Sequence, residues 1–255
     1  MNLLPAFTTA PEPNRIYNVD ALTLMGLLAP NSVDAFVSDP PFCSGGVSEA
    51  SKQQAKGQGL RSETIRAGGW FLNDNMTTAG LVWLLREVAV RARQSLKDGG
   101  SLMFFTDWRM VSHLTPAIES AGYRYQNLIV WNKDSMGLGT GFRAQHELIM
   151  HFVRGTGKFY DMSVGNVITC RRVAVKDREH QTEKPVELML TLIKVVSPVG
   201  GLIVDPFCGS GSTLVAAQAS GRLFIGGDID PEHVETANKR IAEPYTMPLF
   251  AEVPA

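Results

Sequence analysis

The last third of the chain alternates between strand-like and helix-like segments, and this alternation restricts the possible folds more than any other feature. Thr182 is a candidate N-cap of a helix that has Pro185 in its first turn and runs to about Val196. The segments that follow are a strand at 201–205, a helix at 212–220, a strand at 223–228 and a helix at 232–241. Strands that alternate with helices form a largely parallel sheet with helices on both faces. We therefore predict an α/β fold.

The earlier part of the chain contains the same kinds of segment. Strands are predicted at 16–19, 33–37, 101–105, 125–131 and 147–153, and helices at 21–28, 81–96 and 111–121. The stretches 43–78 and 154–181 lack this periodicity, and loops of such length are usually functional or disordered. A chain of 255 residues with 44% hydrophobic residues is large enough for one domain with a real core. We predict a single domain over 1–255, interrupted by these two insertions.

Composition limits where the protein works. No apolar run reaches the roughly 18 residues that a membrane-spanning helix needs. The N-terminus has no basic start and carries Pro5 inside its short apolar stretch, so a signal peptide is not expected. The three cysteines, Cys43, Cys170 and Cys208, show no zinc-binding spacing and no disulfide pattern. We expect a cytoplasmic protein with no membrane association and no metal.

The formal net charge of −1 is low for a protein that binds nucleic acid, which usually has a basic surface. The charge is unevenly distributed, however. Residues 154–184 contain seven Lys and Arg against four Asp and Glu, whereas residues 228–243 contain two against five. A local basic face is compatible with this distribution, and so is ordinary solvated surface charge.

The string Ser-Asp-Pro-Pro-Phe at 38–42 follows directly on a predicted strand. The Asp39 carboxylate and the Pro40 carbonyl can accept hydrogen bonds from a planar amine, and the prolines Pro40 and Pro41 fix the backbone that carries them. Phe42 provides a face on which a base can stack, worth about 1–3 kcal/mol. A proline-stiffened loop without catalytic function is the alternative. We name these four residues as the candidate catalytic clamp.

A second string, Asp-Pro-Phe-Cys-Gly-Ser-Gly-Ser-Thr at 205–213, joins a predicted strand to a predicted helix. Its glycines allow a ligand to approach the backbone, and a helix start supplies free amides. A phosphate-binding loop requires lysine where Gly211 stands, and a dinucleotide fingerprint requires glycine where Leu214 stands. A tight turn without a ligand is the remaining alternative. The candidate cofactor-binding residues here are Asp205, Phe207, Gly209, Ser210, Gly211, Ser212 and Thr213.

These two strings, in this order, resemble the β group of amino-methyltransferases of DNA, whose motif order is circularly permuted. The resemblance covers about 16–42, 80–153 and 180–242. It implies a Rossmann-like methyltransferase fold and the cofactor S-adenosylmethionine. It also implies methyl transfer to an exocyclic amine of a base that is flipped out of duplex DNA. Asp at position 39 favours the N6 amine of adenine. The alternatives are the N4 amine of cytosine and a non-catalytic DNA-binding subunit, which usually lacks one of the two motifs.

The same resemblance suggests three further cofactor residues. Asp228 stands where the family places a carboxylate, most often Glu, against the ribose hydroxyls. Lys184, in Thr-Glu-Lys-Pro at 182–185, belongs to a motif that places a helix start under the cofactor's carboxylate, although Gln181 replaces a common proline. Asp20 matches an aspartate that reaches the adenine amine, and a helix N-cap is the alternative role for it. For Asp230 we expect an N-cap role ahead of a helix.

The remaining resemblance concerns the surroundings of the pocket and the DNA. Residues 131–133, 142–143 and 146–149 match a block that lies near the active-site pocket, in which His146 is expected to position substrate rather than to act as a base or metal ligand. The insertions 43–78 and 154–181 correspond to variable segments that contact DNA, and the family implies a homodimer. Candidate phosphate-binding residues are Lys52, Lys56, Arg61, Arg66, Arg171, Arg172, Lys176 and Arg178.

Overall fold

The computed structural model describes residues 9–41, 77–137, 141–172 and 183–245. Phe42, Thr182 and nearly all of the first predicted insertion lie outside these ranges. Expectations for those residues therefore stay predictions.

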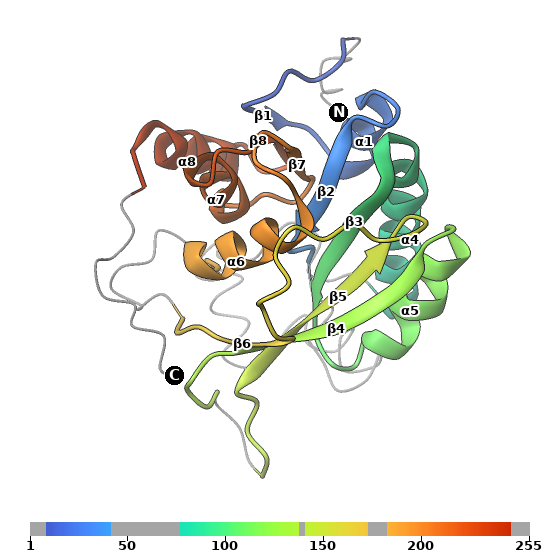
Figure 1. The fold of residues 1–255 in the computed structure, drawn as a ribbon, viewed down its shortest axis with the longest axis vertical. Coiled ribbons are helices and arrows are strands. Elements are labelled where there is room, and N and C mark those ends of the chain that lie inside the picture. The colour runs from blue at the N-terminus through green and yellow to red at the C-terminus, as the bar shows by residue number, and fades with distance from the viewer. Residues whose placement is uncertain (1–8, 42–76, 138–140, 173–182, 246–255) are drawn as a thin grey trace, which may run out of the picture.

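One eight-stranded sheet forms the centre of the described structure (Figure 1). Its strands lie in the order β1-β8-β7-β2-β3-β5-β4-β6, and β5 is antiparallel to both of its neighbours while every other adjacent pair is parallel. The strand bounds are β1 (Arg15–Asn18), β2 (Val33–Ser38), β3 (Leu96–Thr106), β4 (Arg124–Asn132), β5 (His146–Val153), β6 (Val167–Thr169), β7 (Leu202–Asp205) and β8 (Leu223–Asp228). The predicted mostly parallel sheet is confirmed.

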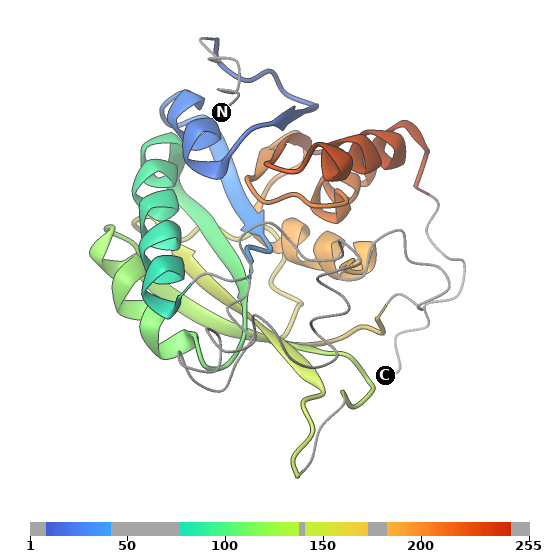
Figure 2. The same cartoon turned by 180° about the vertical axis from the view of Figure 1, so that it is seen from behind.

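Helices cover both faces of this sheet, as the views from front and back show (Figures 1 and 2). One face carries α1 (Ala21–Leu27), α4 (Thr78–Ser95) and α5 (Val111–Ser120). The other carries α6 (Val186–Val196), α7 (Ser212–Ala219) and α8 (Pro231–Ala242). None of the described helices is both long and apolar enough to span a bilayer.

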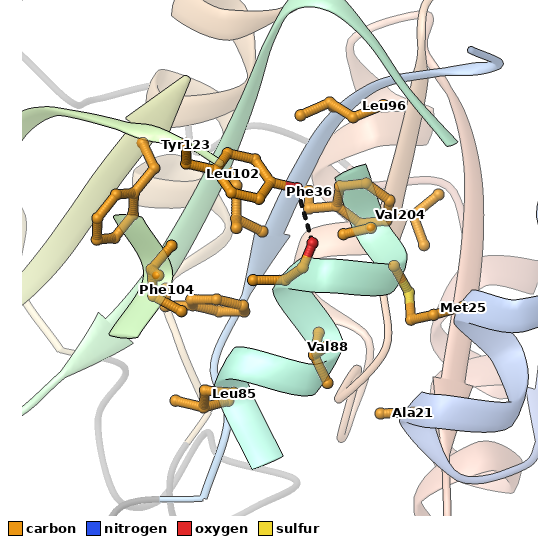
Figure 3. Packing of buried hydrophobic residues seen from close by; sticks show 14 of the residues in the cluster. Ala21, Met25, Phe36, Leu85, Val88, Leu96, Leu102, Phe104, Tyr123 and Val204 are labelled. Atoms are coloured by element: carbon orange, nitrogen blue, oxygen red, sulfur yellow. Dashed lines mark hydrogen bonds between the residues drawn. The ribbon is translucent and has the colours of Figure 1, made fainter. Parts of the chain in front are cut away.

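Alternating side chains of the central strands supply two separate cores. Phe36 of β2 and Phe104 of β3 pack under α1 and α4, together with Leu85 and Tyr123, whose hydroxyl donates to the Ala89 carbonyl at 3.1 Å (Figure 3). Their sequence neighbours point to the other face, under α6 and α7; these are Ala35, Val37, Met103 and Phe105. Burial on both faces is typical of central parallel strands, and it explains why these segments are continuously apolar.

Two element boundaries and one additional strand differ from the prediction. β3 begins at Leu96, directly after α4, rather than at 101, because Gly99 and Gly100 form backbone hydrogen bonds with Arg154 and so extend the strand. β6, at 167–169, was not predicted; it pairs with β4 inside the stretch expected to be irregular. Finally, α6 begins only at Val186. Pro185 takes the N-cap position with an extended ψ of 132°, so the helix is capped three residues later than predicted and Pro185 precedes its first turn.

Candidate active site

The two motifs found in the sequence meet at one edge of the sheet. β2 and β7 are parallel neighbours, so Asp39 and Asp205 both lie at the carboxyl ends of adjacent strands. Ser38, fully buried, donates a hydrogen bond of 2.5 Å to Asp205 Oδ1, across 167 positions of sequence. Ligands in open α/β sheets bind in the crevice at this edge. The candidate catalytic and cofactor-binding segments are therefore adjacent.

Among the described residues, one carboxylate oxygen of Asp39 has a hydrogen-bond partner and the other has none. Its Oδ2 accepts a hydrogen bond from Lys184, and its Oδ1 is buried without a hydrogen-bond partner among the described residues. The side chain as a whole is 23% exposed. Burial raises the pKa of Asp39, and the Lys184 ammonium opposes that rise. A buried acceptor without a partner is costly unless a ligand supplies the donor. Pro40 beside it is buried, and Pro41 is partly exposed.

Asp205 organises the start of the glycine loop. Its Oδ1 accepts from Ser38 and, at 3.1 Å, from the backbone amide of Phe207. Burial raises the pKa of Asp205 to about 6, although hydrogen bonds from Ser38, Thr213 and Phe207 oppose the rise. Phe207 itself is partly buried against the core under α1 and α4. Through these hydrogen bonds Asp205 holds the start of the glycine loop against the end of β2.

The two glycines of the loop are required for different reasons. Gly209 has a φ of +49°, and apart from Gly209 and its two chain neighbours no described residue has an atom within 4 Å of the position that a Cβ would occupy. Gly211 has a φ of +85° and precedes α7, and a Cβ there would stand 2.9 Å from the Ala237 Cβ of α8. Gly211 therefore permits close packing, whereas the described residues leave space beside Gly209 in which a ligand can lie.

Arg240, which the sequence did not single out, contacts the glycine loop through hydrogen bonds. Arg240 of α8 donates to the Ser210 carbonyl at 2.8 Å and lies 3.3 Å from Ser212 Oγ. Its other terminal nitrogen pairs with Glu183 at 2.7 Å, in the segment before α6. Within an amphipathic helix Arg240 resembles any surface arginine, so nothing in the local pattern marks it. Ser210, Ser212 and Thr213 are all buried.

Asp228, at the end of β8, braces the glycine loop. Its Oδ2 accepts from the Gly209 amide at 2.9 Å, and its Oδ1 accepts from the Asp230 amide at 2.9 Å. His233 Nδ1 lies 3.2 Å from the same Oδ1, and this hydrogen bond raises the pKa of His233. Each carboxylate oxygen has two lone pairs, so capacity for a further donor remains. The side chain of Asp230 caps α8 through the Glu232 amide, as expected.

Asp20 serves as the N-cap of α1. It accepts from the Thr23 amide at 3.0 Å and from the Thr23 hydroxyl at 2.6 Å. The helix-capping alternative is therefore observed. A cofactor contact by Asp20 stays a prediction.

Lys184 lies at the candidate catalytic clamp, and a cofactor contact by Lys184 stays a prediction. It lies against Asp39, and its Nζ is also 3.4 Å from Glu147 Oε2. Glu147 in turn accepts from Lys133 at 2.5 Å. The sequence block around 146–149 pointed to His146, which is exposed at the start of β5, whereas the partly buried residue facing the site is its neighbour Glu147.

Known proteins share both the sequence pattern and the fold. The chain matches the N6_N4_Mtase family model, described as DNA methylase, over residues 33–239. It is 23% identical to the type II methyltransferase M2.MboI of Moraxella bovis, over 95% of this chain and 93% of that protein. It is 24% identical to M2.DpnII of Streptococcus pneumoniae, over 87% of each.

Solved structures show the same architecture. The M1.HpyAVI complex with S-adenosylmethionine has a TM-score of 0.63 at 23% identity, covering 89% of this chain and 98% of that one. The cytosine-N4-specific PvuII DNA methyltransferase has a TM-score of 0.69 at 15% identity, covering 96% and 90%. Because the family model matches well over half of the sequence, the chain belongs to the N6_N4_Mtase family of DNA methylases.

Proposed function

We propose that this DNA methyltransferase transfers a methyl group from S-adenosylmethionine to the N6 amine of an adenine flipped out of duplex DNA. The observation that carries the proposal is the Asp39 Oδ1 atom, a buried acceptor without a partner among the described residues. It lies at the edge of the sheet where the glycine loop also begins. An exocyclic amine supplies the N–H donor that such an acceptor needs.

The residues of the glycine loop fit the cofactor. Gly209 leaves open space beside the backbone, and Asp228 lies next to it with acceptor capacity for ribose hydroxyls. The first turn of α7, which begins at Ser212, supplies amides for polar groups of the methionine part. Phe207 and Asp20 complete the proposed contacts. Bound there, S-adenosylmethionine supplies an electrophilic methyl group on a sulfonium sulfur.

Asp39 and Pro40 activate the amine by holding its two N–H groups. Hydrogen bonds to the Asp39 carboxylate and the Pro40 carbonyl pull the nitrogen toward tetrahedral geometry, which localises its lone pair. The nitrogen then forms the new N–C bond in line with the breaking S–C bond, whose electron pair stays on sulfur. The methylated nitrogen afterwards loses one proton. Fixed, preorganised acceptors of this kind stabilise the positive charge that develops on the amine.

The test is mass spectrometry of nucleosides from unmethylated DNA incubated with the protein and S-adenosylmethionine. We expect new N6-methyladenine, since Asp39 rather than serine occupies the clamp. New N4-methylcytosine instead would keep the mechanism and overturn the choice of base; PvuII methyltransferase, which shares the fold, is cytosine-N4-specific. Absence of any modified nucleoside, with cofactor binding intact, would contradict the proposal.

We also propose that the basic residues after β6 contact the DNA backbone. Arg171, 85% exposed, lies 3.0 Å from Asp134, and Arg172 donates to Ser135 at 3.1 Å. Both arginines thus lie beside the loop after β4, at the sheet edge that carries Asp39. The fully exposed Phe142 belongs to the same loop.

Replacing these arginines should weaken DNA binding through loss of charge. Arg171→Gln and Arg172→Gln are each expected to lower the slope of log K against log salt by about 1, uniformly across sequences. Fluorescence anisotropy with labelled duplexes at several salt concentrations measures this. Arg15→Gln is the matched control, because Arg15 begins β1 at the opposite edge of the sheet and pairs with Glu12 at an exposed site. Equal slopes for all three variants would contradict the assignment.

A further inference from the structure

Four charged side chains of alternating sign converge at the active-site edge. They come from four separate elements: Asp39 follows β2, Lys184 precedes α6, Glu147 lies in β5 and Lys133 follows β4. Lys184 contacts both carboxylates, and Lys133 contacts Glu147 at 2.5 Å. The charges sum to zero, which is what a partly buried cluster requires.

Lys184 is the most enclosed member of this cluster. Its side chain is only 7% exposed, and its Nζ lies 5.1 Å from the centroid of the Phe105 ring. Burial by itself lowers the pKa of Lys184, but Asp39 and Glu147 outweigh burial and hold it above its usual value. The two lysines likewise keep the pKa of Glu147 low in spite of its burial. The Lys184 ammonium therefore lies between the carboxyl groups of Asp39 and Glu147.

This arrangement determines which oxygen of Asp39 is available. Lys184 takes Oδ2, and Oδ1 is left as the buried acceptor that the target amine requires. The terminal torsion of an aspartate is broad, so without a fixed partner either oxygen could face the base, or neither. A fixed ammonium removes that freedom before substrate arrives.

We propose that Lys184 is a positioning residue for Asp39, holding Oδ2 so that Oδ1 meets the target amine, and that Glu147 fixes Lys184. The inference rests on the proposed function of Asp39. This role differs from the cofactor contact that the sequence resemblance suggests for Lys184. Lys133 affects Lys184 only indirectly, through its contact with Glu147.

The cluster also sets the pH at which Asp39 works. Burial raises the pKa of Asp39, Lys184 and Lys133 lower it, and Glu147 raises it. Asp205, whose own pKa burial raises to about 6, is the other acidic group nearby. A protonated Asp39 is a weaker acceptor for the amine. Removing Lys184 raises the pKa of Asp39 further. As the pH is lowered, the variant should therefore lose activity at a higher pH than the wild type does.

The test measures kcat and KM between about pH 5 and 9 for Lys184→Met and Lys184→Arg, together with S-adenosylmethionine affinity by calorimetry. For Lys184→Met we expect the acidic limb of kcat to move up by about one pH unit or more. At pH 7 we expect kcat to fall about 100-fold, which is within the range for losing a preorganised group. Cofactor affinity should change by less than about threefold. Lys184→Arg keeps the positive charge, so its acidic limb of kcat should lie near the wild-type pH.

Glu147→Gln is a second variant, and it should shift the acidic limb in the opposite direction from Lys184→Met. Its negative charge raises the pKa of Asp39, so its removal should move the acidic limb to lower pH while kcat still falls because Lys184 is held less firmly. Lys97→Met is the matched control: Lys97 pairs with the buried Asp34 at 2.8 Å at the start of β3, and the limb should stay in place.

Two results would overturn the inference. One is an unmoved acidic limb in Lys184→Met, and the other is a loss of cofactor affinity of about 30-fold or more at unchanged kcat, which would return Lys184 to the cofactor site. Failure of the proposed function is a separate outcome, because it would appear as a wild-type protein that modifies no nucleoside.

Discussion

Asp39→Ala is expected to lower kcat for methyl transfer by about 10³-fold, close to the effect of removing one preorganised charge-stabilising group. The substitution removes the only side-chain acceptor of the proposed clamp and leaves the Pro40 carbonyl to hold the amine alone. S-adenosylmethionine affinity should change by less than about threefold, since Asp39 contacts Lys184 rather than the glycine loop. Single-turnover kinetics with saturating DNA and cofactor measures the chemical step directly.

Asp39→Asn is the control that removes the negative charge of the side chain while keeping its shape. It keeps the volume and one acceptor oxygen, so we expect a smaller loss than for alanine. Lys184 retains Glu147 as a partner in both variants, and thermal unfolding should show that both are folded. Near wild-type kcat in the alanine variant would show that Asp39 is not the catalytic acceptor.

Gly209→Leu is expected to weaken S-adenosylmethionine binding by at least about 100-fold, or about 2.7 kcal/mol. No described atom lies within 4 Å of the point where its Cβ would stand, so the leucine side chain would enter the space that we assign to the cofactor. The fold should lose only the cost of a left-handed backbone, about 1–2 kcal/mol. Calorimetric titration with S-adenosylmethionine, together with urea unfolding, separates the two effects.

Gly211→Ala is the comparison that gives this prediction its contrast. Its Cβ would stand 2.9 Å from Ala237, so α7 and α8 must separate and the free energy of unfolding should drop by more than in Gly209→Leu. If Gly209→Leu binds cofactor normally, the open side of the loop is not the cofactor site. If both variants lose stability equally, the distinction between the two glycines is wrong.

Local pattern was sufficient for most of the architecture. Residues 33–38 and 202–205 are short apolar runs between polar turns, and both form central parallel strands whose ends carry Asp39 and Asp205. Parallel strands have their carboxyl ends at the same edge of a sheet, so placing these two motifs at one edge required only the α/β alternation. The boundaries of β3 and α6 were less predictable. Glycine usually lies in a turn but here lies within a strand at Gly99 and Gly100, and proline is common in the first turn of a helix but here Pro185 is the N-cap.

By itself, the sequence determined the fold class and located the candidate catalytic clamp and the glycine loop, because each depends on residues that are close together in the chain. Only the tertiary structure decided what surrounds them. The contact between Lys184 and Asp39 spans 145 positions, and Arg240 reaches Ser210 across 30. Glu147 faces Lys184 only because β5 runs antiparallel beside β3 and so begins at the active-site edge. Charges paired across such distances leave no periodicity in the sequence, since folding alone brings them within hydrogen-bonding distance.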